Sequence, residues 1–251
     1  MPKKFKLFGI CVIILSIGLS FVLADLFSSL ITVGNFAFLT TQTTKCNSYT
    51  IYAVSIEKAL SMTQAKDKVE SVVQKNGAGF IYSKDNVYYV LASGYENKSD
   101  AEKVVEHLSD SGVSSEIVEI KVDKIEIDMN LSTNEKTTMS ESINLFKNTY
   151  KTLYDISISL DTAVKSKSEC KLLLNDLKAN VLKTQSNFDT QFNSKLNSKL
   201  LSIKLQINEL TTTIQTLINN ADNDLLSAHI KCAYLETIKL NQSLANDINS
   251  N

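Results

Sequence analysis

The chain has 251 residues, with 26 basic residues, 27 Asp plus Glu and a formal net charge of −1. All 26 basic residues are Lys. Nucleic-acid and phosphate sites favour a basic face and the bidentate fork of Arg, so this composition argues against a nucleic-acid partner. Abundant Lys, Asn, Ile and Ser without Arg is typical of an AT-rich bacterial genome.

Near the N-terminus, three Lys precede the uncharged segment Leu7–Ala24. Eighteen helical residues at about 1.5 Å each span roughly 27 Å, close to the hydrocarbon thickness of a bilayer. We therefore expect a cytoplasmic tail at 1–6, a transmembrane anchor at 7–29 and a juxtamembrane linker at 30–46. Lys on the N-terminal side predicts that the rest of the chain lies outside the cytoplasm. The alternative is a cleaved signal peptide ending near Ala24.

Residues 47–127 predict a compact order of strands and helices. Strands are expected where β-branched and aromatic residues cluster, at Tyr49–Ile56 and Val87–Ser93, and where apolar and charged residues alternate from Ile117. Helical spacing of apolar residues from Lys58 to Lys75 and from Ser99 to Gly112 separates them, and Ser99 with Glu102 suggests a capping box. Ser83–Asn86 predicts a hairpin turn.

This block resembles the SPOR domain, a small peptidoglycan-binding module of bacterial envelope proteins. The resemblance rests on Tyr49–Ser55, on Val87–Tyr95, and on the helix that follows Asn97. It departs from the family pattern where Ser55 replaces a common Gly and where the loop after Gly94 is one residue short. The resemblance implies an α+β fold with βαββαβ order, a four-stranded antiparallel sheet, both helices on one face and an open opposite face.

In the SPOR family the open face of the sheet binds glycan strands stripped of their stem peptides. Matched by motif position, Tyr52, Ser55 and Tyr88 would line that face. Sugars suit such a surface because their apolar ring faces stack on aromatic rings and their hydroxyl groups need polar partners. The alternative is that these tyrosines only pack the sheet, and a bulge near Ala53 or Ser55 would move them to the other face.

The C-terminal part, from residue 128 to 251, contains neither Gly nor Pro and predicts an all-α domain. Ser132 with Glu135, and Ser166 with Glu169, are expected capping boxes. A heptad-like seam of apolar residues follows, with every step three or four: Leu196, Leu200, Ile203, Ile207, Leu210, Ile214, Leu217 and Ala221. A fourth helix is expected from Leu225. Two architectures satisfy the pattern: a folded-back helical bundle, or a coiled coil with partner chains.

Few residues suggest catalytic or metal chemistry. The chain has only two His, and His229 with Cys232 lacks the further ligands that a zinc site needs, so we predict no metal and no cofactor. Cys170 and Cys232 are a candidate disulfide pair outside the membrane, which would leave Cys46 for intermolecular pairing. Without a catalytic motif we predict no enzymatic activity, with a hydrolase hidden in the helical half as the alternative.

These features together predict a single-pass membrane protein of the bacterial envelope. The expected function is binding of peptidoglycan glycan strands, which would localise the protein to cell-wall sites such as a division or sporulation septum. The alternative is a helical adaptor or scaffold that binds another envelope protein, in which the sheet contacts protein rather than glycan. The helical domain would then bind a protein partner or self-associate.

Overall fold

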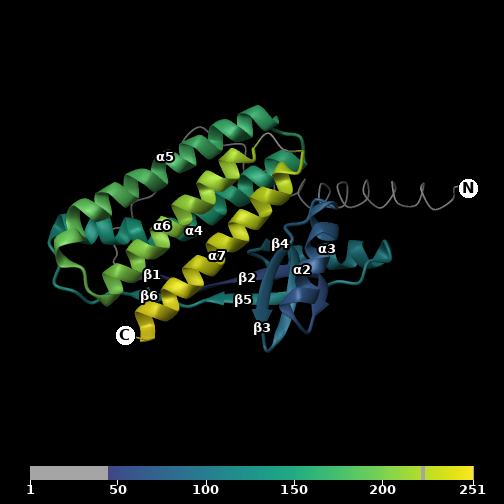
Figure 1. Cartoon of the computed structure of the whole chain (residues 1–251), viewed down its shortest axis with the longest axis horizontal. Coiled ribbons are helices and arrows are strands. Elements are labelled where there is room, and N and C mark those ends of the chain that lie inside the picture. Colours follow the sequence, from purple (N-terminus) through teal and green to yellow (C-terminus); the bar gives the residue numbers. More distant parts are fainter. Residues whose placement is uncertain (1–44, 222–223, 251) are drawn as a thin grey trace, which may run out of the picture.

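The computed structural model describes residues 45–221 and 224–250 of the chain, and it shows an α+β fold in which an antiparallel sheet lies against a bundle of long helices (Figure 1). The expected anchor at 7–29 lies outside these described residues. Within the described residues, none of the helices is both long enough and apolar enough to cross a bilayer.

Two groups of elements follow each other along the chain. The first group, the sheet module, comprises β1 (Lys45–Cys46), β2 (Tyr49–Ala59), α2 (Met62–Val73), β3 (Phe80–Lys84), β4 (Val87–Tyr95), α3 (Lys98–Asp110), β5 (Glu116–Val122) and β6 (Ile125–Glu126). The second group, the bundle, comprises α4 (Thr133–Asp161), α5 (Lys167–Phe192), the 3-10 helix η2 (Asn193–Lys195), α6 (Ser198–Asn219) and α7 (Leu226–Ser250).

The main sheet has the strand order β3-β4-β2-β5, and every neighbouring pair is antiparallel. From β2 to β5 the elements alternate as strand, helix, strand, strand, helix, strand, which is the expected order. Outside this sheet, β1 and β6 form a short ribbon in which Lys45 pairs with Glu126 and Cys46 with Ile125. The ribbon joins the start of the described chain to the end of the sheet module.

The turns of the sheet module follow local sequence, whereas one predicted helix cap does not form. The hairpin between β3 and β4 is confirmed, because Asp85 and Asn86 both have positive φ, as a two-residue type I′ loop requires. After α2, Asn76 also has a positive φ, which Asn adopts more readily than most residues. The predicted cap of α3 is wrong: the N-cap is Asn97, and Ser99 lies inside the helix.

A double irregularity in the pairing of β2 with β4 decides which side chains share a face. The register shifts between Val54 and Ser55 and again between Ser55 and Glu57. Each extra residue reverses the alternation of a strand, so residues before and after the shift exchange faces. Consequently Val54, ahead of the shifts, and Ala59, beyond them, both lie on the side of α2 and α3 although an odd number of positions separates them.

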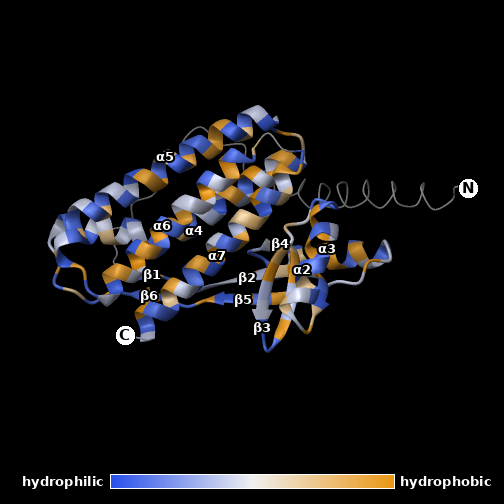
Figure 2. Ribbon diagram, viewed as in Figure 1, coloured by the Kyte–Doolittle hydropathy of each residue, from blue (hydrophilic) through white to orange (hydrophobic). Residues whose placement is uncertain are grey.

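The helical half is a folded-back four-helix bundle, in which α4, α5, α6 and α7 each pack against the next and α7 returns to α4. Both predicted capping boxes are present, at Ser132–Glu135 and Ser166–Glu169. The predicted seam of α6 is buried from Leu200 onward, while its first member, Leu196, is exposed. Apolar and polar stretches alternate along these helices at helical intervals (Figure 2).

Helix α7 joins the two groups of elements into one core. It contacts α4 and α6 on one side and β3, β4, β5 and β6 on the other. Sheet residues such as Ile51 and Leu91 therefore belong to the same apolar cluster as Phe146 of α4 and Leu235 of α7. The expected open face of the sheet is thus not open in the described structure: α2 and α3 cover one face and α7 covers the other.

Candidate functional site

The structure does not bring the three predicted glycan-binding residues together on an exposed surface. Tyr52 packs beside α3, and Tyr88 packs with the cluster under α2. The two tyrosines lie at opposite ends of paired strands, seven residues or roughly 23 Å apart. Ser55 is buried, and its hydroxyl oxygen lies 2.8 Å from the carbonyl oxygen of Glu57 and 3.3 Å from that of Val90.

The face expected to bind glycan instead receives polar contacts from α7. The side-chain amide of Asn241 donates to the Tyr49 hydroxyl at 2.9 Å, and that of Asn249 donates to the Lys124 carbonyl at 2.9 Å. Gln242 donates both to the Lys121 carbonyl of β5, at 2.9 Å, and to a hydroxyl of β3. Because β3 and β5 are the two edges of the sheet, this one side chain bridges both edges.

At Gly94 the helix comes closest to the sheet backbone. The Tyr234 hydroxyl accepts a hydrogen bond from the Gly94 N–H at 2.8 Å. A Cβ at position 94 would lie 2.9 Å from a methyl carbon of Ile51 and 3.1 Å from one of Leu235. Only glycine leaves room here, so the glycine near the end of β4 serves as the contact point for α7.

Aromatic rings fill the interface around this contact. The Tyr154 ring meets Tyr95 and Tyr234 edge to face, with centroids 6.3 and 5.9 Å apart. Burial raises the pKa of Tyr95 to about 12 and raises the pKa of both other phenols further above the ordinary value. These hydroxyl groups therefore stay neutral at physiological pH and act as hydrogen-bonding groups rather than as acids or bases.

A buried ion pair fixes the other end of the interface. The Lys231 ammonium lies 2.7 Å from the Asp161 carboxylate, and the two side chains are only 3% and 5% exposed. The same carboxylate accepts hydrogen bonds from the Ser227 hydroxyl at 2.5 Å and from the Asn76 amide at 3.0 Å. Lys231 also donates to the Asn76 carbonyl at 2.9 Å. The network thus links α4, α7 and the loop after α2.

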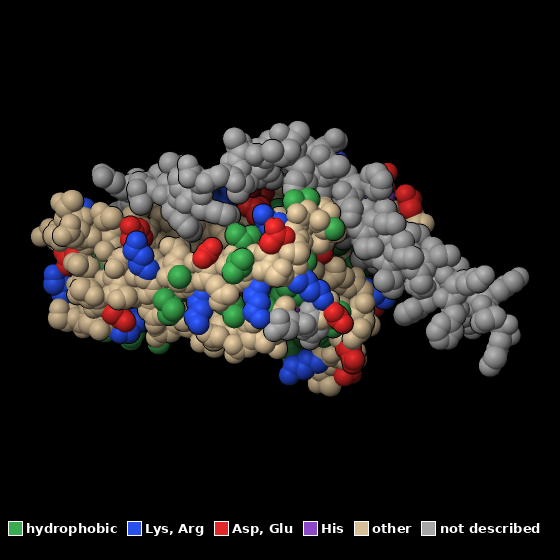
Figure 3. Space-filling view, turned by 90° about the horizontal axis from the view of Figure 1, so that it is seen from above, with side chains coloured by type: hydrophobic (Ala, Val, Ile, Leu, Met, Phe, Trp, Pro, Cys, Tyr) green, Lys and Arg blue, Asp and Glu red, His purple; other side chains and the backbone are tan. Residues whose placement is uncertain are grey.

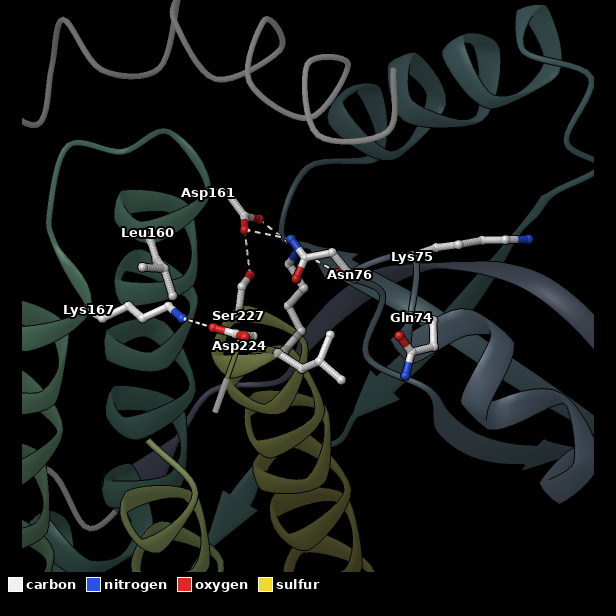
Figure 4. A pocket seen from close by; sticks show the side chains of 10 residues that line it. Gln74, Lys75, Asn76, Leu160, Asp161, Lys167, Asp224 and Ser227 are labelled. Atoms are coloured by element: carbon white, nitrogen blue, oxygen red, sulfur yellow. Dashed lines mark hydrogen bonds and ion pairs between the residues drawn. The ribbon is translucent and has the colours of Figure 1, made fainter. Parts of the chain in front are cut away.

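A cavity of about 330 Å³ opens beside this network (Figure 4). Lys167 and Asp224 stand at its edge, where their side chains form an ion pair at 2.7 Å. The charged groups that line the cavity are largely directed to one another, as the dashed lines of the figure show. Lys231 is held by a carboxylate and a carbonyl, an arrangement that suits a structural ion pair rather than a nucleophile.

The sulfur and imidazole groups form no site in the described part of the chain. Cys46, Cys170 and Cys232 are free, so the candidate disulfide is not formed in this structure. Cys170 is on α5 and Cys232 on α7, two helices that are not neighbours in the ring of the bundle. The described residues contain no group of three or more His, Cys, Asp or Glu side chains that could hold a metal ion.

Sequence reasoning missed the residues that matter most in this interface: Asp161, Lys231 and Tyr234. One signal was present, because Lys231 and Asn241 lie among the apolar positions of α7, at sites that turn out to be buried. Their spacing from Tyr234 is three and seven residues, which places all three on one face. The sequence therefore indicated a polar contact face on this helix, but it did not indicate which element of the fold would contact that face.

Comparisons of the chain with protein-family models, curated proteins and solved structures find no match. The resemblance to the SPOR domain stays a prediction from the sequence of residues 49–108.

Proposed function

We propose that this protein is a membrane-tethered adaptor of the bacterial envelope that works by binding and has no catalytic turnover. In this proposal the sheet is a structural platform for the bundle and does not stack glycan. The observation that carries it is the position of α7, whose contacts with Gly94, Tyr49 and Lys121 occupy the face through which a SPOR-like sheet would take a sugar chain. The tether is the expected anchor at 7–29.

Binding of glycan strands is the second candidate, and the order of strands and helices favours it. For a glycan strand to reach the sheet face that α7 covers, α7 would have to detach from the sheet. That step would expose buried side chains such as Tyr234 and Leu235 and would leave the Gly94 N–H without its partner. Exposing apolar surface to water costs about 25 cal/mol per Å². The state in which α7 covers the sheet therefore predominates unless ligand binding contributes more free energy than this exposure costs.

A pull-down on purified sacculi, before and after amidase removes the stem peptides, tests the choice. The adaptor proposal predicts that residues 45–251 are not retained on either preparation. Retention on the stripped sacculi would contradict it and would support glycan binding. The measurement is the bound fraction by gel densitometry.

The variant Gly94→Val adds a matched test of the covered face. Its side chain would collide with Ile51 and Leu235, which loosens α7. The control is Gly112→Ala, which carries backbone strain at φ +74° but meets no neighbour within 4 Å. If glycan binding is only masked, Gly94→Val gains retention on stripped sacculi and the control does not. The adaptor proposal predicts no gain for either variant.

A further inference from the structure

Lys231 is the only buried lysine among the described residues, and its side chain is 3% exposed. The other lysines of the described chain lie at least partly in solvent, and Figure 3 shows several of them at the surface beside Asp or Glu side chains. A buried ammonium group loses its hydration, so groups of the protein must take the place of water. The groups that do so around Lys231 therefore decide what this side chain can do.

Three side chains from distant parts of the sequence meet here, and we call them the interface triad: Asn76 after α2, Asp161 at the end of α4 and Lys231 of α7. The Oδ2 atom of Asp161 lies 2.7 Å from the Lys231 ammonium. Its Oδ1 atom accepts a hydrogen bond from the Asn76 side-chain amide at 3.0 Å, and Figure 4 shows these two side chains directed at each other. Lys231 also donates to the backbone carbonyl of Asn76 at 2.9 Å. The carboxylate thus bridges an amine and an amide that already lie together.

We propose that the interface triad forms an intramolecular amide bond between Nζ of Lys231 and Cγ of Asn76, with release of ammonia. The ion pair that the structure shows is the state before reaction, in which Lys231 is a structural cation and not yet a nucleophile. Transfer of one proton from Lys231 to Asp161 makes the amine neutral. Burial favours this transfer, because separated charges lack hydration there. A neutral lysine amine is a nucleophile for carbonyl carbon atoms.

The reaction balances within the interface triad. The Nζ lone pair attacks Cγ of Asn76, and the bond between Cγ and Nδ2 breaks. Asp161 relays two protons from Nζ to the departing nitrogen, since its Oδ2 faces the amine and its Oδ1 faces the amide. The nitrogen therefore leaves as ammonium, and Asp161 is again a carboxylate. Attack requires Nζ at about 3–3.5 Å from Cγ, and the flexible lysine side chain supplies this movement from its present contact with Asn76.

A second nucleophile competes for Asn76, because the next residue is Gly77 and a glycine nitrogen in this position can attack the same Cγ. In this fold the Gly77 N–H donates to the Val72 carbonyl at 3.0 Å, which directs that nitrogen toward the end of α2. The cavity in Figure 4 is lined by all three residues of the interface triad and gives the ammonium a way to solvent. The local geometry thus favours the lysine over the backbone nitrogen.

The same chain contains a matched control for this chemistry. Lys204 lies 2.8 Å from Asp189 and 2.6 Å from the side-chain oxygen of Asn193, so the same three residue types meet. The lysine and aspartate side chains of this group are 25% and 34% exposed. Water stabilises an ammonium group that it can reach, so Lys204 stays charged. We expect no bond between Lys204 and Asn193.

The bond in the interface triad would join the loop after α2 to α7 across 155 positions of the chain. A covalent link that closes so long a loop removes conformational entropy from the unfolded chain and holds α7 on the sheet. The proposal goes beyond the adaptor function and does not depend on it, since the reaction occurs once in each molecule and needs no partner.

Digestion of the full chain with a lysine-specific protease, followed by mass spectrometry, tests the proposal. An acylated Lys231 is not cleaved, so the expected product joins the peptide Asn76–Lys84 to the peptide Leu205–Lys239. Its mass should be lower than the sum of the two peptides by one ammonia. The joined fraction should increase as the purified, folded protein is incubated before digestion.

Two comparisons accompany this measurement. The peptides of the control group, Thr184–Lys195 and Leu200–Lys204, should appear only separately in the same digest. The variant Asp161→Asn should lower the joined fraction about tenfold or more, because it removes the group that relays the protons. Circular dichroism checks that the parent and the variant are folded.

Separate peptides Asn76–Lys84 and Leu205–Lys231 from folded, incubated parent protein, without the joined product, would overturn the proposal. Loss of ammonia confined to Asn76–Lys84 would also overturn it and would assign the reaction to the Gly77 nitrogen. An undiminished joined fraction in Asp161→Asn would contradict the role of Asp161. The parent protein alone decides whether the bond forms, so a variant that does not fold leaves the test intact. None of these results bears on retention by sacculi, so the two proposals fail separately.

Discussion

Asp161 and Lys231 show how single residues hold the sheet module to the bundle. Both are almost fully buried, and each is bound to groups from other elements of the fold. Removing one member of a buried ion pair leaves an uncompensated charge, whereas removing both leaves an apolar gap. The pair therefore specifies how α7 is placed more than it adds net stability.

We predict that Lys231→Met lowers the free energy of unfolding by about 3–5 kcal/mol, because Asp161 then stays buried without its cation. The double variant Asp161→Leu/Lys231→Met should recover part of that loss. Urea denaturation of residues 45–251 measures both. Lys204→Met is the matched control: its ion pair with Asp189 is only partly buried, and its loss should cost under about 1 kcal/mol. A loss for Lys231→Met as small as that of the control would contradict the prediction.

At the same scale, the sequence predicts the identity of the strands better than the direction of their side chains. Tyr52 and Tyr88 lie on the predicted strands, but they face α3 and α2. Both tyrosines lie on the face that α2 and α3 cover, and which face these helices cover depends on packing between distant residues, which leaves no local sequence signal. Gly94 was recognised as part of a motif, and its role as a contact point for Tyr234 depends on a residue 140 positions later.

The individual helices and turns follow local rules closely. The two capping boxes and the hairpin at Asp85 and Asn86 form as predicted, since each depends on residues within four positions of one another. The cap of α3 is the exception: Asn97 precedes the motif at Ser99 and starts the helix two residues earlier. Where α7 would dock was not predictable in this way, because a helix with apolar residues on most sides gives no single preferred partner.

The capping box of α4 also predicts a pH dependence. Glu135 pairs with Lys195 at 2.5 Å, and this contact, with hydrogen bonds from Ser132, lowers the pKa of Glu135 from 4.5 to about 2. A carboxyl group whose pKa is lowered in the folded state contributes stability above its unfolded pKa and loses that contribution as the pH falls through the folded value. Stability from Glu135 should therefore decline between about pH 4.5 and pH 2.

We predict that Glu135→Gln lowers the melting temperature at pH 7. The melting temperature of this variant should also fall less than that of the parent as the pH is lowered from 4.5 to 2. The control is Glu169→Gln, which alters the equivalent capping box of α5, where no lysine partner at this distance is found among the described residues. Thermal melts followed by circular dichroism across this range compare the three proteins. If the melting temperatures of the parent and of Glu135→Gln change in parallel with pH, the Glu135 carboxylate does not contribute to the pH dependence of stability.

At the scale of the whole described structure, the sheet and the bundle share one apolar core. The largest apolar cluster runs from Cys46 in β1 to Ile248 in α7 and includes both sheet and helix residues. The sequence suggested separate modules at 47–127 and 128–251, because the change from alternating to helical patterns is sharp at that point. Their shared core depends on contacts between distant residues, which periodicity does not report.

A shared core predicts that residues 45–251 unfold in a single cooperative step. Circular dichroism reports mainly the long helices, and the fluorescence of the nine tyrosines reports mainly the sheet module and the interface that Tyr95, Tyr154 and Tyr234 form. In urea the two signals should give the same midpoint within error. Two separated transitions, with the tyrosine signal lost first, would mean that α7 leaves the sheet while the bundle stays folded.

The central position of β2 has a mechanical consequence. A pull on the chain ahead of Lys45 first meets the ribbon of β1 and β6, which pairs only two residues on each strand. Once that ribbon peels away, the load reaches β2, which is hydrogen-bonded along both edges, to β4 and to β5. A tether attached at this end would thus yield in two stages, with a short extension at low force and then firm resistance from the middle of the sheet.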